Sequence, residues 1–161
     1  MRKLMIIAFA LLILAACGNS QQKANDVKIH ELEDRAGLAY LPKSDKPFTG
    51  TAYAYFSDGV TVYQKTGFVD GKQHGEYIEY LPNGQVSYKR NYANGAEDGE
   101  WIEYFENGNV RKKQTYKNGQ LNGEWITYYE NGQTRVKGQF ENGEEVGEWF
   151  AYDENGNQVE R

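Results

Sequence analysis

The chain has 161 residues, enough for one domain of ordinary size, and carries a formal net charge of −5. An acidic chain without a basic stripe gains no counterion release from a phosphate backbone, so we expect neither nucleic acid nor anionic lipid as a direct partner. Thirteen tyrosines, seven phenylalanines and three tryptophans stand beside eighteen glycines, and the single cysteine excludes an intramolecular disulfide. Aromatics and glycines in these numbers are typical of short strands joined by tight turns.

The N-terminus has the layout of a secretory signal. Arg2 and Lys3 precede an apolar run over residues 4–16, which is shorter than the roughly 20 residues that a membrane-spanning helix needs. An ordinary signal peptide and an uncleaved anchor are both compatible with this layout. Removal of the leader would take Arg2 and Lys3 with it and change the formal net charge from −5 to −7.

The end of the apolar run resembles a bacterial lipobox, Leu14-Ala15-Ala16-Cys17. The resemblance implies cleavage before Cys17 and acylation of its thiol and its new amino group, and two or more acyl chains anchor a protein stably in a membrane. It therefore predicts a lipid-anchored protein of the cell envelope. The residue after the cysteine is Gly18 and not an aspartate, which favours the periplasmic face of the outer membrane if the organism has one.

Composition divides the rest of the chain into three parts. Residues 17–28 are polar with little to bury and predict a flexible tether. Residues 29–49 predict an N-terminal β cap, because a first hairpin is expected around the break at 35–37 and Pro42 and Pro47 suit a strand end or a sheet edge. Residues 50–161 are repetitive.

Self-similarity with a period of 24 residues indicates a repeat architecture in this last part. A glycine opens each regular copy, an aromatic residue lies two positions on, a tyrosine five on, and an Asn-Gly pair eight and nine on. The recurring positions are Gly75, Gly99, Gly123 and Gly147; Tyr77, Trp101, Trp125 and Trp149; and Tyr80, Tyr104, Tyr128 and Tyr152. The copies span about 50–74, 75–98, 99–122, 123–146 and 147–161, of which the first is degenerate.

The Asn-Gly pairs predict hairpins, because a type I′ turn requires positive φ at both central residues. Two turns per repeat imply two strands, for example over residues 101–105 and 110–116. Alternation then places Trp101 and Glu103 on one face and Ile102 and Tyr104 on the other, so both faces carry large side chains. The predicted fold is all-β: an elongated, single-layer antiparallel β-meander of repeated hairpins that advances about 10 Å per repeat.

Residues 92–108, 116–132 and 140–156, which read YANGAEDGEWIEYFENG, YKNGQLNGEWITYYENG and FENGEEVGEWFAYDENG, resemble the MORN-repeat variant of bacterial proteins labelled antitoxins of the YwqK type. The opening of the folded part, residues 37–59, is similar to the start of those proteins. The resemblance implies a β-sheet repeat module used for protein or membrane association and, for some members, neutralisation of a toxin. It carries over no catalytic residue.

The residues available for catalysis or metal binding are few. His30 and His74 do not recur and are expected to be solvated. The glutamates at Glu76, Glu100, Glu124 and Glu148 recur in each of the four regular copies, whereas a catalytic pair of carboxylates occurs once and in two different environments. We therefore expect a solvated acidic stripe, partly balanced by Arg111, Lys112 and Lys113, and no enzyme activity, cofactor or metal site.

The aromatic series Tyr77, Trp101, Trp125 and Trp149 has two interpretations. It is a structural ladder that replaces a core, or a binding face whose rings, at intervals of about 10 Å, stack sugars or cationic head groups. Our main hypothesis is a lipoprotein with a non-enzymatic module for a protein partner. An antitoxin or immunity-like protein and an envelope glycan-binding module are the alternatives. Specificity is expected at positions that the repeat leaves free, such as Arg111, Lys112 and Gln114.

Overall fold

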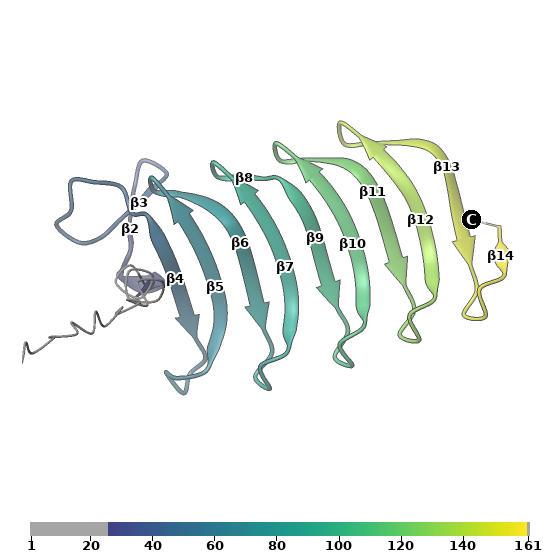
Figure 1. The fold of residues 1–161 in the computed structure, drawn as a ribbon, viewed down its shortest axis with the longest axis horizontal. Helices are drawn as coiled ribbons and strands as arrows, with labels where there is room; N and C mark the ends of the chain where they lie inside the picture. The colour runs from purple at the N-terminus through teal and green to yellow at the C-terminus, as the bar shows by residue number, and fades with distance from the viewer. Residues whose placement is uncertain (1–25, 161) are drawn as a thin grey trace, which may run out of the picture.

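The computed structural model describes residues 26–160; the predicted signal peptide, Cys17 and most of the predicted tether lie outside the described residues. The described part folds into one 12-stranded sheet and a separate two-stranded sheet. Figure 1 shows the strands of the large sheet side by side in chain order, which makes an elongated single layer. This part of the chain contains no α-helix, and so none that is long and apolar enough to cross a membrane.

The large sheet confirms the predicted meander of hairpins. Its strand order is β1 (Asp26–Lys28), β4 (Gly50–Tyr55), β5 (Val62–Val69), β6 (Lys72–Tyr80), β7 (Val86–Ala93), β9 (Gly99–Tyr104), β10 (Val110–Lys117), β11 (Gln120–Tyr128), β12 (Thr134–Glu141), β13 (Glu144–Tyr152) and β14 (Gln158–Val159). The short strand β8 (Ala96–Glu97) pairs with β7 off this path. From β4 onward every pairing is antiparallel, because each connection is a tight turn.

The N-terminal edge differs from the prediction. Asp26–Lys28, which we assigned to the tether, form β1 and pair in parallel with β4, with Val27 opposite Ala52. The pairing is parallel because the chain leaves the sheet after β1 and returns to it only at β4, through the cap. The sheet is therefore mixed at this edge, whereas we expected only antiparallel strands.

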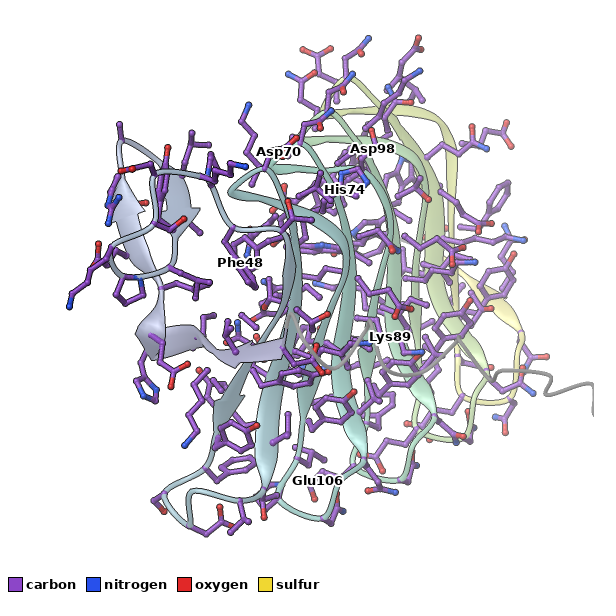
Figure 2. All side chains as sticks on the ribbon, turned by 60° about the vertical axis from the view of Figure 1, so that its left-hand side comes forward. Phe48, Asp70, His74, Lys89, Asp98 and Glu106 are labelled. Carbon is purple, nitrogen blue, oxygen red and sulfur yellow. The ribbon has the colours of Figure 1, made fainter. Side chains whose placement is uncertain are left out.

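The cap consists of the 3-10 turn η1 (Ile29–Glu31) and the hairpin of β2 (Glu33–Arg35) and β3 (Leu38–Tyr40). Two backbone hydrogen bonds attach it to the first repeat: Ala39 N–H donates to Gly71 O at 2.9 Å and Gly71 N–H donates to Phe48 O at 2.8 Å. Phe48 is only 4% exposed and its ring lies 5.8 Å from that of Phe68. Figure 2 shows Phe48 on the side of the sheet toward the cap hairpin.

Register defines two faces of the sheet. We call the side that carries Trp101 and Trp125 the Trp face; there Gln114 lies opposite both tryptophans. The other side, which carries Ile102 and Ile126 opposite Lys113, is the Tyr face. Few side chains are fully buried in a single layer, so cross-strand contacts between neighbouring side chains supply the stabilisation. The buried ones are Phe48, Ala52, Ala54, Gln64, Thr66, Ile78, Gln114, Ile126 and Ala151.

The Asn-Gly and Asp-Gly pairs form two kinds of turn. At the upper edge of Figure 1 both turn residues have positive φ, as in Asn118 (51°) and Gly119 (83°), which confirms the predicted type I′ turn. At the lower edge only the glycine has positive φ, so the predicted type I′ turn is wrong there. From Asn83 onward the lower turns are three-residue loops: Leu81 N–H donates to Gln85 O and Gly84 N–H donates to Leu81 O, both at 2.8 Å. Such a loop is a type I turn followed by a glycine in the left-handed region. The first lower turn is one residue longer, because there Phe56 N–H donates to Thr61 O.

Both edges connect successive repeats. At the upper edge the turn glycine donates to the preceding repeat, for example Gly95 N–H to Gln73 O and Gly119 N–H to Glu97 O, both at 2.8 Å. At the lower edge Asn131 Nδ2 donates to Glu154 O at 2.9 Å. Figure 2 shows Asp70, His74 and Asp98 along the upper edge and Glu106 at the lower one. These bonds fix the stacking of one hairpin on the next.

A candidate binding groove on the Trp face

The predicted aromatic series lies on the Trp face, and each of its rings is half-buried. Two of them pack against a second aromatic of their own repeat, Tyr77 with Tyr92 at 6.2 Å and Trp101 with Tyr116 at 4.6 Å between ring centroids. Trp149 packs against Phe140 of the preceding repeat, at 5.3 Å. These contacts are those of the structural ladder. The predicted tyrosine series Tyr80, Tyr104, Tyr128 and Tyr152 is half-buried too.

The spacing expected for a ring array that stacks sugars does not hold at the C-terminal end. The Trp125 and Trp149 centroids lie 5.4 Å apart instead of the predicted interval of about 10 Å. The reason is Gly138, which occupies the position between them and has no side chain to separate the two indoles. These two tryptophans therefore form one cluster.

Arg90 interrupts the series. It lies opposite Tyr77, at the position that Gln114 occupies one repeat later. Its Cζ atom lies 5.1 Å from the ring centroid of Tyr77, 5.4 Å from that of Tyr88 and 4.4 Å from that of Trp101. Its Nε is buried without a hydrogen-bond partner. Cation–π attraction to three rings thus holds this guanidinium on the Trp face.

A β-bulge in the second strand of four hairpins, in β5, β7, β10 and β12, directs one further side chain to the same face. In β10 the register shifts between Val110 and Lys112, so Arg111 is an extra residue. Arg111 Nη1 lies 2.6 Å from Glu103 Oε1, and Lys112 Nζ lies 3.8 Å from Glu103 Oε2, so consecutive side chains contact the same carboxylate. Strict alternation would have separated them.

The bulge recurs, but its residue type does not. The extra residues are Tyr63, Ser87, Arg111 and Arg135. Three of them lie against the ring that follows the first strand: Tyr63 on Phe56, Arg111 on Phe105 and Arg135 on Tyr129. Because no residue type marks the position, the sequence offered no signal for it. The structure thereby brings Arg111 and Lys112, which we expected to be variable specificity positions, onto one face.

Two carboxylates are held within the Trp face. Glu103, whose side chain is 12% exposed, accepts a hydrogen bond from Tyr88 in addition to its contacts with Arg111 and Lys112. Burial raises the pKa of Tyr88, and the bond to Glu103 adds to this. In the preceding repeat Tyr77 Oη donates to Glu79 Oε1 at 2.5 Å, and burial followed by this bond raises the pKa of Tyr77 strongly. Both carboxylates are therefore fixed in place.

Two hollows on the Trp face adjoin each other. The larger, of about 640 Å³, has Glu103, Phe105, Arg111, Lys112, Tyr129 and Arg135 among its lining residues, with Glu130 and Glu154 at the lower edge. The smaller, of about 140 Å³, includes Tyr88, Arg90, Trp101 and Gln114 in its lining. Glu103 and Lys112 line both hollows, so the two hollows form one depression across β7 to β12. We call it the Trp-face groove.

The acidic stripe is solvated, as expected. Glu76, Glu100, Glu124 and Glu148 are exposed. Lys113 Nζ lies 2.6 Å from Glu100 Oε1, and this contact raises the pKa of Lys113. Arg111 and Lys112, which we also expected to balance this stripe, contact Glu103 on the opposite face instead.

Both histidines are exposed. His74 Nδ1 accepts the Asn94 N–H at 3.5 Å and so belongs to the upper edge. Within residues 26–160 no group of three His, Asp or Glu side chains is placed to hold a metal ion.

The fold defines a β-repeat protein built from hairpins of 24 residues, stacked through both edges. Residues 73–94, 97–118 and 121–142 match the family model of the MORN repeat variant. Each matched segment begins two residues before a repeat glycine, at Gly75, Gly99 and Gly123. Such repeats indicate a module for protein or membrane interaction. A search of curated proteins found no match to the chain.

Proposed function

We propose that this chain is a lipoprotein, anchored in the cell envelope through Cys17, whose MORN repeat sheet binds a protein partner through the Trp-face groove without catalysing a reaction. One observation carries the proposal: Arg90, Arg111, Lys112 and Arg135, which stand at positions whose residue type is not the same in every repeat, line one continuous groove. Recognition of a particular partner requires side chains that differ between repeats, and this face supplies them.

The form of the groove favours a macromolecule over a small ligand. A small-molecule site buries most of its ligand within a concave, largely apolar cavity. The Trp-face groove lies on a single-layer sheet, so it has a floor but no second layer above it. Its lining includes Glu103, Arg111, Lys112 and Arg135. Charged groups on an open surface suit a partner that brings its own complementary surface.

Affinity capture tests the proposal. The full chain, carrying a C-terminal tag, is expressed in its own bacterium and recovered from solubilised membranes. The double variant combines Arg111→Ser with Arg135→Ser. Serine is chosen because Ser87 occupies the equivalent position of an earlier repeat. The matched control is Lys89→Gln with Lys137→Gln, which removes two positive charges from the Tyr face.

We expect one protein to be retained by the native chain and the control and lost with the double variant. Purified, that protein should bind the native chain directly and at a defined stoichiometry. Failure to enrich any protein, or equal enrichment by the double variant, would contradict the proposal. A toxin as the retained protein would make the module an immunity protein at the membrane, whereas rescue by an added cell-wall glycan would favour the glycan-binding alternative.

A further inference from the structure

We propose that the partner presents an extended acidic segment to the Trp-face groove, and that Arg90 and Arg135 bind carboxylates near the two ends of this segment. The inference rests on the proposed function and specifies the chemistry of the partner. It follows from which charges on this face already have a partner and which have none.

Arg90 has a fixed position and no anionic partner. Three rings surround its guanidinium, the nearest being Trp101 at 4.4 Å from Cζ. The ion pairs found within residues 26–160 involve Arg35, Arg111, Lys112 and Lys113 and do not include Arg90. Its Nε is buried without a partner, and Arg90 is one of the residues that line the smaller hollow. A carboxylate there would form charge-assisted hydrogen bonds with a cation that the rings have already oriented.

Arg135 provides the second anchor. It is exposed, its Cζ lies 5.8 Å from the ring centroid of Tyr129, and the ion pairs found among the described residues do not include it. Between the two arginines, Arg111 and Lys112 share the single carboxylate of Glu103. The floor of the groove therefore carries more positive than negative charge, on a chain whose formal net charge is −5.

The distance between the anchors sets the form of the ligand. Arg90 lies on β7 and Arg135 on β12, which are four neighbouring steps apart in the sheet order β7-β9-β10-β11-β12. At about 4.8 Å per step this is roughly 19 Å, the length of about six residues of extended chain. A segment lying across the strands, with acidic residues about five or six positions apart, would reach both guanidinium groups.

A recessed groove with an acidic rim suits a polypeptide better than a flat anionic membrane. Glu130 and Glu154 line the groove at the lower edge of the sheet, and both are exposed. A flat surface would meet these carboxylates before it reached the basic floor, and like charges would repel it. An extended segment that runs across the strands from β7 to β12 lies above this edge and does not have to pass over these carboxylates.

The test measures binding of a defined peptide to the full chain in detergent micelles by fluorescence anisotropy. The probe is a labelled eight-residue peptide of alternating Glu and Ser, compared with the same peptide carrying Gln in place of Glu. Arg90→Gln introduces the residue of the equivalent Gln114, and Arg135→Ser that of Ser87. Lys137→Gln, on β12 but on the Tyr face, is the matched control. Circular dichroism checks the folding of each variant, and if Arg90→Gln does not fold, the exposed Arg135 carries the test.

We expect the Glu peptide to bind at least about tenfold more tightly than the Gln peptide at low salt, with the preference falling as salt rises. Each arginine variant should reduce affinity for the Glu peptide about fivefold or more, and Lys137→Gln less than about twofold. Equal affinity for the two peptides, or a preference unchanged by both arginine variants, would overturn the inference.

Binding to lipid vesicles tests the alternative that the groove binds an anionic membrane. Cys17→Ser in the full chain removes the contribution of acyl chains, and binding to vesicles of phosphatidylglycerol and phosphatidylcholine is measured by flotation. Arginine-dependent vesicle binding without peptide binding would replace the proposed partner with an anionic membrane. The peptide experiment decides the chemistry of the ligand and affinity capture decides the proposed function. A partner retained independently of Arg90 and Arg135 would therefore overturn only the inference drawn here.

Discussion

Gly138 lies beneath the indole ring of Trp149, and the missing side chain lets Trp149 approach Trp125 to 5.4 Å between ring centroids. A Cβ atom at position 138 would overlap the Trp149 ring. Trp149 also meets Phe140 edge-on, at 5.3 Å and an interplanar angle of 89°. This cluster supports the C-terminal end of a sheet that has no second layer, because aromatic pairs add to the burial that the single layer provides.

Gly138→Ala should therefore destabilise the protein. The added methyl group must displace the indole, and overpacking of this kind costs about 1–3 kcal/mol. Urea unfolding followed by tryptophan fluorescence measures the loss. Gln139→Ala, on the same strand but exposed, should stay within about 0.5 kcal/mol of the native chain. In a Trp149→Ala background the cost of Gly138→Ala should largely disappear. If the costs of the two substitutions were additive instead, the contact between position 138 and Trp149 would be contradicted.

Two chemically identical Asn-Gly pairs should respond differently to Asn→Gly. Asn118 has φ of 51° in a type I′ turn, where glycine is equally suited, so Asn118→Gly should change stability by less than about 0.5 kcal/mol. Asn131 accepts Gln133 N–H at 2.9 Å and donates to Glu154 O at 2.9 Å, so Asn131→Gly should cost about 1–2 kcal/mol. Chemical denaturation measures both, and equal costs would show that the two edges are not distinct.

The tyrosines should make the protein sensitive to alkali. Burial raises the pKa of the phenols of Tyr53, Tyr77, Tyr80, Tyr88, Tyr116 and Tyr128 above the usual value. In the unfolded chain they lose their protons near pH 10, so the folded state binds more protons above that pH. The free energy of unfolding should thus be independent of these groups below pH 10 and fall as the pH rises further.

Urea unfolding between about pH 8 and pH 11, with absorbance titration of tyrosinate, checks the alkaline prediction. Tyr128→Phe should reduce the slope of stability against pH above pH 10, because one titrating group is removed. A stability that rose through this window would contradict the assignment of the shifts to burial.

Trp125→Ala separates the structural from the glycan-binding interpretation of the ring series. Since Trp125 packs against Trp149, its truncation should destabilise the sheet by about 2 kcal/mol, less than for a fully buried tryptophan because Trp125 is half-buried. Thermal unfolding and a cell-wall pull-down are measured together. Normal stability with lost polysaccharide binding would support the glycan-binding interpretation instead.

Cys17→Ser tests the lipid anchor. If the sequence before Cys17 acts as a lipobox, the native chain should incorporate an alkyne-labelled fatty acid and fractionate with membranes. The variant should do neither, because acylation supplies the anchoring energy. Membrane association of the variant equal to that of the native chain would contradict lipidation and favour an uncleaved anchor.

The repeat, its two strands and the single-layer sheet could all be predicted from the sequence. The strands expected over residues 101–105 and 110–116 are β9 (Gly99–Tyr104) and β10 (Val110–Lys117). They were predictable because turn residues and side-chain alternation act over a few neighbouring positions, and the period of 24 residues repeats the same signal. The face of the ring series follows from the same alternation.

Only the tertiary structure decided which side chains share the groove. The bulge that turns Arg111 toward Glu103 depends on the register with β9, and the enclosure of Arg90 depends on rings from β6 and β9. The same holds for the edge strand at Asp26–Lys28, whose partner lies beyond the cap. In each case the deciding contact joins residues on different strands, and no local pattern in the sequence specifies which strands will meet or where a register will shift.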